Sequence, residues 1–178
     1  MTGWRLGWMV VPDHLVDTMN RLSQNIYISP PTLSQLAAIS AFQAFDELNG
    51  HIEVYRINRE IVLRTLHELN LDTDISPSDG AFYVYVDLSR AGVTDALQLC
   101  NRLLDEAHVA VTPGVDFEDP STGLGYKRVR FSFCRKTEEV EEGMRRFSNW
   151  WRRNMLLGND GRGDASECVV PSEGESNG

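Results

Sequence analysis

The chain contains 178 residues, of which 42% are hydrophobic, 24% are charged and 9% are aromatic. This composition suits one sizeable domain or two small ones, and it excludes a disordered, collagen-like or disulfide-rich chain. The formal net charge of −9 argues against nucleic acid as a partner, because phosphate binding depends on clustered Lys and Arg side chains. No apolar run approaches the length of a membrane-spanning helix, so we expect no membrane association.

The cysteines and the end of the chain carry two further signals. The three cysteines lack the spacing of a zinc site, and their odd number is typical of a reducing compartment. We therefore predict a soluble, cytoplasmic protein with no metal ligands. Residues 157–178 hold one Arg against five acidic residues and are rich in Gly, Ser and Asn, which predicts a disordered acidic tail.

Hydrophobic periodicity predicts one strand and three helices in the first part of the chain: a strand over residues 4–11, a helix beginning near Asp13, a helix over 33–45 and a longer helix over 51–69. The Pro12-Asp13 pair ends the strand, and Asp13 is a candidate N-cap for the first helix. Thr32 is a candidate cap for the second helix, which follows a break at Ser29-Pro30-Pro31.

After Leu71 the pattern changes to short strands and amphipathic helices. The predicted elements are a strand over residues 81–87, a helix over 94–107, a short strand over 109–111, a strand over 127–134 and a final helix that Thr137 caps and that ends near Met155. This β-α-β-β-α order predicts a small α/β sandwich whose helices cover one face of a sheet.

Five short motifs stand in order along the chain: Gly3-Trp-Arg-Leu-Gly7, Pro31-Thr-Leu-Ser-Gln-Leu-Ala-Ala38, Ser78-Asp-Gly-Ala-Phe-Tyr83, Val109-Ala-Val-Thr-Pro-Gly-Val-Asp-Phe117 and Val129-Arg-Phe-Ser-Phe133. Together they resemble the class I and II pyridoxal-phosphate-dependent aminotransferases of fold type I, over roughly residues 1–151. One such motif alone would be weak, but five in the family's order are specific.

The resemblance implies roles for two arginines. Arg5 falls where the family pairs an arginine with the cofactor phosphate, and Arg130 falls where an arginine binds the substrate carboxylate. A planar guanidinium grips a carboxylate through two parallel hydrogen bonds, which a lysine cannot do. Strand alternation puts Arg128 and Arg130 on the same face, so periodicity does not choose between them. The motif favours Arg130.

The resemblance also implies an architecture and an assembly. Residues 1–50 would be the end of a large cofactor-binding domain, residues 51–70 a connecting helix and residues 71–156 a small C-terminal α/β domain. The cofactor would be pyridoxal 5′-phosphate, and the substrates would be an amino acid and a 2-oxo acid. The intact parent would be a homodimer.

The family's Schiff-base lysine precedes the phosphate-binding arginine by eight positions, which places it before Met1. We therefore interpret the chain as the C-terminal part of an aminotransferase, truncated just after that lysine and inactive by itself, with no catalytic residue in the sequence. Two alternatives stay open. One is a stand-alone, non-catalytic domain that binds a carboxylate or a partner subunit, which predicts no exposed apolar edge at residues 4–11. The other is a fragment of a related fold-type-I lyase that uses the same cofactor.

Overall fold

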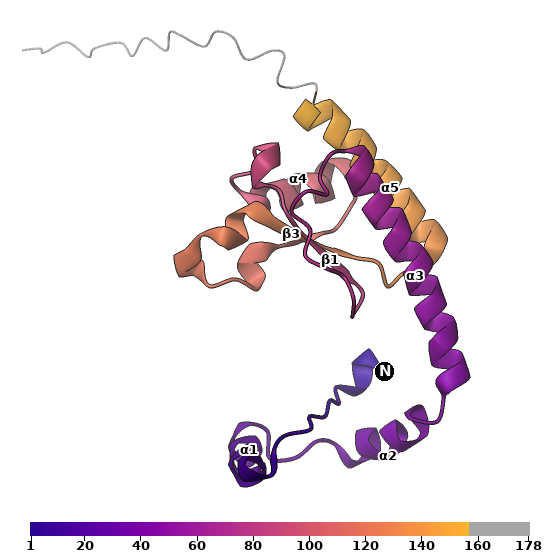
Figure 1. Cartoon of the computed structure of the whole chain (residues 1–178), viewed down its shortest axis with the longest axis vertical. Helices are drawn as coiled ribbons and strands as arrows, with labels where there is room; N and C mark the ends of the chain where they lie inside the picture. The colour runs from indigo at the N-terminus through magenta and orange to yellow at the C-terminus, as the bar shows by residue number, and fades with distance from the viewer. Residues whose placement is uncertain (157–178) are drawn as a thin grey trace, which may run out of the picture. The chain divides into compact units, whose positions relative to one another are not determined.

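The computed structural model describes residues 1–156, and the chain divides into two compact units. Unit 1 comprises Met1–Glu53, and unit 2 begins at Val54. Both α-helices and β-strands are present, which confirms the predicted mixed α/β class (Figure 1). The predicted acidic tail at 157–178 lies outside the described residues, and the predicted domain boundaries stay a prediction.

Unit 1 consists of a 3₁₀ turn and helices: η1 (Thr2–Trp4), α1 (Asp13–Ile26), α2 (Thr32–Ala41) and the first part of α3 (Phe45–Glu68). The two predicted N-caps are each wrong by one residue, because Asp13 and Thr32 are already helical. The N-caps are Pro12 and Pro31, which make no side-chain capping hydrogen bond. Their rings fix φ near −60°, which fits the extended conformation that precedes a first turn.

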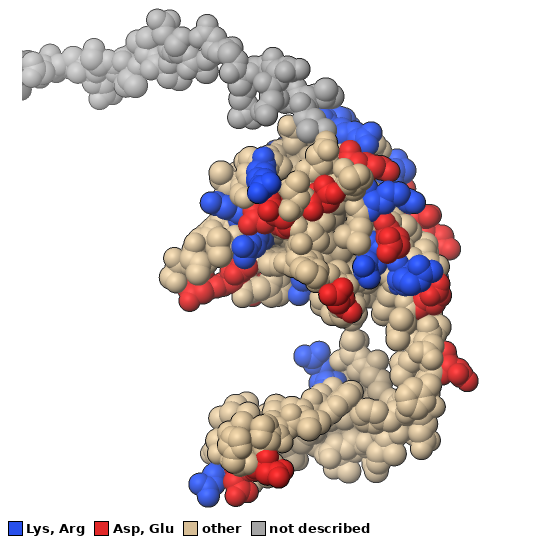
Figure 2. All heavy atoms as spheres, in the orientation of Figure 1, with Lys and Arg blue, Asp and Glu red and all other residues tan. Residues whose placement is uncertain are grey.

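The strand predicted at residues 4–11 is wrong. A strand needs a neighbouring strand to satisfy its backbone N–H and C=O groups, and every strand among the described residues lies in unit 2. The segment is instead attached to α2, because the Ser34 hydroxyl donates a 2.9 Å hydrogen bond to the Trp4 carbonyl. Val10 is 94% exposed. Figure 2 shows that charged side chains cover little of the visible surface of unit 1.

The sheet of unit 2 is antiparallel, with strand order β1-β3-β2. Its strands are β1 (Tyr83–Asp87), β2 (Thr112–Pro113) and the central β3 (Arg128–Ser132). The short strand predicted at residues 109–111 is wrong by three positions. The Val109 amide donates to the Leu103 carbonyl, so this stretch completes the C-terminal cap of the preceding helix.

Two further helices of unit 2 follow the predicted amphipathic patterns. Helix α4 (Ala96–Ala107) is capped by the Asp95 carboxylate, which accepts a hydrogen bond from the Gln98 amide. Helix α5 (Thr137–Trp151) begins after its N-cap, Lys136, so the predicted Thr137 cap is wrong by one residue. The chain then continues as a π-helical turn (Arg152–Leu156). The β-α-β-β-α order of the strands and α-helices after α3 agrees with the prediction.

The core of unit 2 lies between one face of the sheet and the helices. The Phe131 ring of β3 packs edge-on against Phe147 of α5, with 5.1 Å between the ring centroids. Helices α3 and α5 run side by side (Figure 1) and together line one surface groove. The largest fully buried apolar side chains are Trp150, Trp151, Phe147, Leu66, Leu88, Leu103, Val62, Val84, Val86 and Val129.

A buried asparagine fixes the end of the central strand. Asn58 of α3 is fully buried, and its side-chain amide donates to the carbonyls of Phe133 at 3.0 Å and Arg135 at 2.7 Å. These carbonyls follow β3 directly, so α3 holds the C-terminal end of that strand. Without the side-chain amide of Asn58, the carbonyls of Phe133 and Arg135 would lose this hydrogen-bond donor. Each buried polar group left unsatisfied costs about 1–3 kcal/mol.

Candidate functional site

The face of the sheet opposite the helices carries aromatic and charged side chains. Burial alternates along β1 and β3, so that the valines and Phe131 face the core. The register pairs Tyr85 with Arg130 and Asp87 with Arg128, which makes them direct cross-strand neighbours. The other face therefore groups six residues of these two strands: Tyr83, Tyr85, Asp87, Arg128, Arg130 and Ser132.

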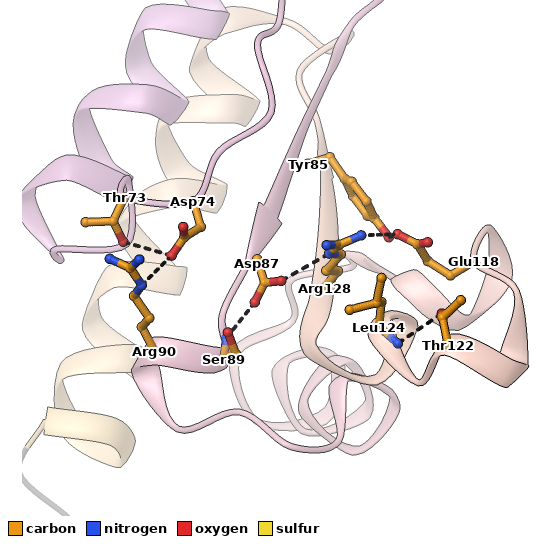
Figure 3. Close-up of polar contacts among 10 residues, drawn as sticks. All are labelled: Thr73, Asp74, Tyr85, Asp87, Ser89, Arg90, Glu118, Thr122, Leu124 and Arg128. Atoms are coloured by element: carbon orange, nitrogen blue, oxygen red, sulfur yellow. Dashed lines mark hydrogen bonds and ion pairs between the residues drawn. The ribbon is translucent and has the colours of Figure 1, made fainter.

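Arg128 is paired with two carboxylates (Figure 3). Its Nε donates to Asp87 Oδ2 at 3.1 Å, and its Nη1 donates to Glu118 Oε1 at 2.7 Å. The Tyr85 hydroxyl donates to the same Glu118 oxygen at 2.9 Å. These two donors lower the pKa of Glu118, with Arg128 the larger cause. Burial, together with the bond to Glu118, raises the pKa of Tyr85 to about 12.

Glu118 reaches the sheet because the loop that carries it packs closely against its neighbours. A Cβ atom at Gly114 would lie 2.7 Å from the Tyr85 hydroxyl and 2.8 Å from the Gly125 carbonyl. A Cβ atom at Gly125 would in turn lie 2.8 Å from the Val115 nitrogen. Glycine at both positions therefore allows two parts of the loop to approach each other and the strand.

Arg130 has a different environment from Arg128. Its guanidinium carbon lies 4.1 Å from the ring centroid of Tyr83 and 4.2 Å from that of Phe117. Its Nε is buried without a hydrogen-bond partner, and no carboxylate within residues 1–156 forms an ion pair with it. The side chain therefore keeps a positive charge that the described part of unit 2 does not neutralise.

Arg5 lies in unit 1 and is exposed. It adopts a left-handed backbone conformation with φ of 49°, and its Nη1 makes a long 3.4 Å hydrogen bond to the Thr2 carbonyl. With Trp8 and Pro30, among others, it lines a pocket of about 920 Å³. Ser23, Tyr27 and Ser29 add hydroxyl groups to the same pocket.

Other kinds of site find no support in residues 1–156. No group of three or more His, Cys, Asp or Glu side chains there is arranged to hold a metal ion. None of the helices in this part of the chain combines the length and the apolar character that crossing a membrane requires. The sequence contains two lysines, Lys127 and Lys136, and both belong to unit 2.

Sequence reasoning did not assign roles to the residues that distinguish the two arginines. Tyr83 and Phe117 lie inside quoted motifs, yet neither was predicted to contact Arg130. Strand alternation could have identified Tyr83, because it shares the face of Arg130. No local pattern identifies Phe117 or Glu118, since the irregular loop that precedes β3 folds back over the sheet and brings them there.

Fold and site together define a mixed α/β protein that presents one uncompensated arginine on the open face of a small sheet. The model of the family "Aminotransferase class I and II" matches residues 1–147. The chain therefore belongs to the class I and II aminotransferases, whose members use pyridoxal phosphate, and the predicted resemblance is confirmed at that level.

Two curated relatives show how much of a family member the chain represents. It is 43% identical over 152 residues to valine–pyruvate aminotransferase of Mycobacterium tuberculosis, and 32% identical over 152 residues to (5-formylfuran-3-yl)methyl phosphate transaminase of Methanocaldococcus jannaschii. Each match covers 84% of this chain. The chain spans 38% of the length of each relative.

Solved structures agree with this relationship. A crystal structure of an aminotransferase from Mycobacterium tuberculosis matches with a TM-score of 0.72 at 43% identity, over 84% of this chain and 38% of that one. The aromatic aminotransferase from Pyrococcus horikoshii matches with a TM-score of 0.72 at 29% identity, over 88% of this chain and 41% of that one.

Proposed function

We propose that the chain is the C-terminal part of a pyridoxal-phosphate-dependent aminotransferase that moves an amino group between an amino acid and a 2-oxo acid. Family membership supports the cofactor and the reaction class. In this proposal residues 1–50 complete the large cofactor-binding domain, residues 51–70 connect, and residues 71–156 form the small domain. A homodimeric parent and a cytoplasmic location are part of the same proposal.

The observation that carries the proposal is the uncompensated guanidinium of Arg130. Its neighbour Arg128 forms ion pairs with Asp87 and Glu118. Arg130, in contrast, contacts two aromatic rings and pairs with no carboxylate among the described residues. A substrate carboxylate would supply the missing partner through a bidentate pair. Holding that group fixes the rotation of the substrate, and so the direction of its Cα–H bond.

Arg5 suits the cofactor phosphate. Its guanidinium is exposed at a pocket that Ser23, Tyr27 and Ser29 also line. The Tyr27 hydroxyl donates to Ser23 Oγ and the Ser29 hydroxyl donates to the Pro30 carbonyl, which leaves the Ser23 hydroxyl as a donor for a phosphate oxygen. An arginine beside such a donor offsets the charge of a phosphate dianion. When bound, pyridoxal phosphate supplies an electron sink, and the protein supplies orientation and control of protonation.

Unit 1, which contains Arg5, has no lysine that could carry the cofactor. Transamination needs a lysine that both holds the cofactor and moves the proton from the substrate Cα. Lys127 and Lys136 are the two lysines of the chain, and neither lies in the unit that contains Arg5. We therefore propose that the chain by itself does not transaminate.

Both alternatives are less well supported. A stand-alone domain would bury the apolar residues at 4–11, but Trp8 is 74% exposed and Met9 66% exposed. A fold-type-I lyase could use the same two arginines in the same way. The two curated relatives described above are named as a valine–pyruvate aminotransferase and a transaminase, which favours amino-group transfer.

Carboxylate binding by the full chain tests the role of Arg130. The chain is titrated with pyruvate, and the arginine Nε–H signals are followed by NMR, with uncharged pyruvamide as the ligand control. We expect pyruvate at millimolar concentration to shift the Arg130 signal, and Arg130→Gln to abolish binding. Arg135→Gln is the matched control, because Arg135 is exposed just beyond the same strand. Unchanged pyruvate binding by Arg130→Gln would contradict the proposal.

The absence of transaminase activity is tested separately. The chain is incubated with pyridoxal phosphate and an amino donor, reduced with borohydride, and digested for mass spectrometry. We expect no turnover and no site-specific cofactor adduct. An adduct confined to Lys127 or Lys136, accompanied by turnover, would show that the chain is a competent enzyme.

A further inference from the structure

We propose that Phe117 and Glu118 are positioning residues for Arg130. The ion pair between Glu118 and Arg128 fixes the loop, and the adjacent Phe117 ring then holds the Arg130 guanidinium in the orientation that receives a carboxylate. This inference rests on the proposed function of Arg130 and assigns the structural cause of its orientation.

The loop is held at Glu118 and at Gly114. Glu118 Oε1 accepts hydrogen bonds from both Arg128 and Tyr85, which lie on neighbouring strands (Figure 3). The amides of Phe117 and Glu118 both donate to the Gly114 carbonyl, at 2.9 Å and 3.0 Å. Gly114 itself packs against the sheet without space for a Cβ atom. The backbone on both sides of Phe117 is therefore tied to the strands.

Burial in the core does not explain where the Phe117 ring lies. The side chain is 52% exposed, and its close ring contact within residues 1–156 is with Arg130. A guanidinium that packs through its face against aromatic rings keeps its N–H donors at the edge, in the plane of the group. Contacts with Phe117 and Tyr83 therefore restrict the Arg130 rotamers while leaving donors for a carboxylate.

The carboxylate of Glu118 is directed to Arg128 and not to Arg130. It forms an ion pair with Arg128, two residues earlier on β3, so this carboxylate, which directly follows Phe117, is already neutralised. Ordering Arg130 before the ligand arrives reduces the entropy that binding must overcome. One arginine of the strand thus secures the loop, and the other is left to bind.

The test uses the full chain and the Nε–H signal of Arg130, whose proton is shifted by the nearby ring currents. Phe117→Leu keeps an apolar side chain but removes the ring. We expect this signal to move toward that of an ordinary exposed arginine, and the pyruvate affinity to fall about two- to fivefold. Glu118→Ala removes the oxygen that accepts both hydrogen bonds and so releases the loop, and we expect the same two changes in the same direction.

Two variants separate positioning from general structure. Phe117→Tyr keeps an aromatic ring at this position, and we expect its Arg130 signal and its pyruvate affinity to match those of the wild-type chain. Tyr126→Leu removes another exposed aromatic side chain between the loop and β3, and we expect no change in either readout. Thermal unfolding followed by near-UV circular dichroism identifies variants that retain the fold.

The outcomes distinguish the positioning role from the proposed function. A folded Phe117→Leu variant with an unchanged Arg130 signal and unchanged affinity would overturn the positioning role. A shifted Arg130 signal in Phe117→Leu, combined with no pyruvate binding by the wild-type chain, would support positioning and reject the carboxylate site. A changed signal in Tyr126→Leu equal to that in Phe117→Leu would also overturn the specific role of Phe117.

Discussion

Helices α1 and α5 are equally amphipathic, but they differ completely in burial. No side chain of α1 is buried, whereas α5 buries Val140, Met144, Phe147, Trp150 and Trp151. The same contrast holds between the units, because the sole buried residue in residues 1–53 is Ser34. Amphipathic spacing therefore predicts that a helix forms, but it does not identify the surface that covers its apolar face.

The largest expected effect comes from removing a core ring in unit 2. Phe147 is fully buried between Phe131 and Trp151, so Phe147→Ala should lower the free energy of unfolding by about 3–5 kcal/mol. Leu22 of α1 is 51% exposed, and Leu22→Ala should change it by less than about 0.5 kcal/mol. Urea denaturation followed by circular dichroism measures both. Equal losses would show that the apolar face of α1 is packed after all.

Substitutions of two glycines, one in each unit, extend the comparison of the units to positions outside the hydrophobic core. Gly114→Ala would push a methyl group against the Tyr85 hydroxyl and the Gly125 carbonyl, and should cost about 1–3 kcal/mol of unfolding free energy. Gly50→Ala in the unit 1 part of α3 meets nothing within 4 Å and should be neutral or stabilising, by up to about 1 kcal/mol. Differential scanning calorimetry compares the two. Loss of stability in both variants would mean that packing around Gly50 is also tight.

The smallest effect concerns an exposed pair at the end of α3. His67 Nδ1 lies 2.5 Å from Asp72 Oδ2, and this hydrogen bond raises the pKa of His67 above 6.5 and lowers the pKa of Asp72 below 3.8. The pair thus stabilises the fold between these ordinary values. Its contribution is lost as the pH rises through the raised pKa of His67 or falls through the lowered pKa of Asp72.

Asp72→Asn should therefore lower the pKa of His67, which an NMR titration of the imidazole signals measures. Glu47→Gln, beside His51 in unit 1, is the control and should leave the titration of His67 unchanged. A pKa of His67 that is the same with and without the Asp72 carboxylate would show that the pair does not form in solution.

Most elements of unit 2 could be predicted because their patterns are local. Alternation in β1 and β3, and helical spacing in α4 and α5, agree with the contacts that those elements make. The strand at residues 4–11 could not be tested locally, since a strand depends on a partner. The shift of β2 to Thr112–Pro113 follows from a capping hydrogen bond that no hydropathy pattern encodes.

The site was predictable in part for the same reason. Alternation correctly placed Arg128 and Arg130 on one face of β3. Their different environments depend on Glu118 and Phe117, which the chain brings back to the sheet through the close approach of Gly114 and Gly125. Tertiary contacts of this kind leave no periodic signal in the sequence. The motif therefore favoured Arg130, although the sequence offered no physical reason to prefer it to Arg128.

The central position of β3 has a consequence for how this site can fail. Arg130 is paired with Tyr85 on one side and Thr112 on the other, while Phe131 points into the core. Deleting one residue between Arg128 and Arg130 would reverse the inward and outward positions of all that follows in the strand. An arginine would then enter the core and a phenylalanine would leave it. Ligand recognition and folding therefore share one alignment of the backbone, and losing that alignment abolishes both in a single step.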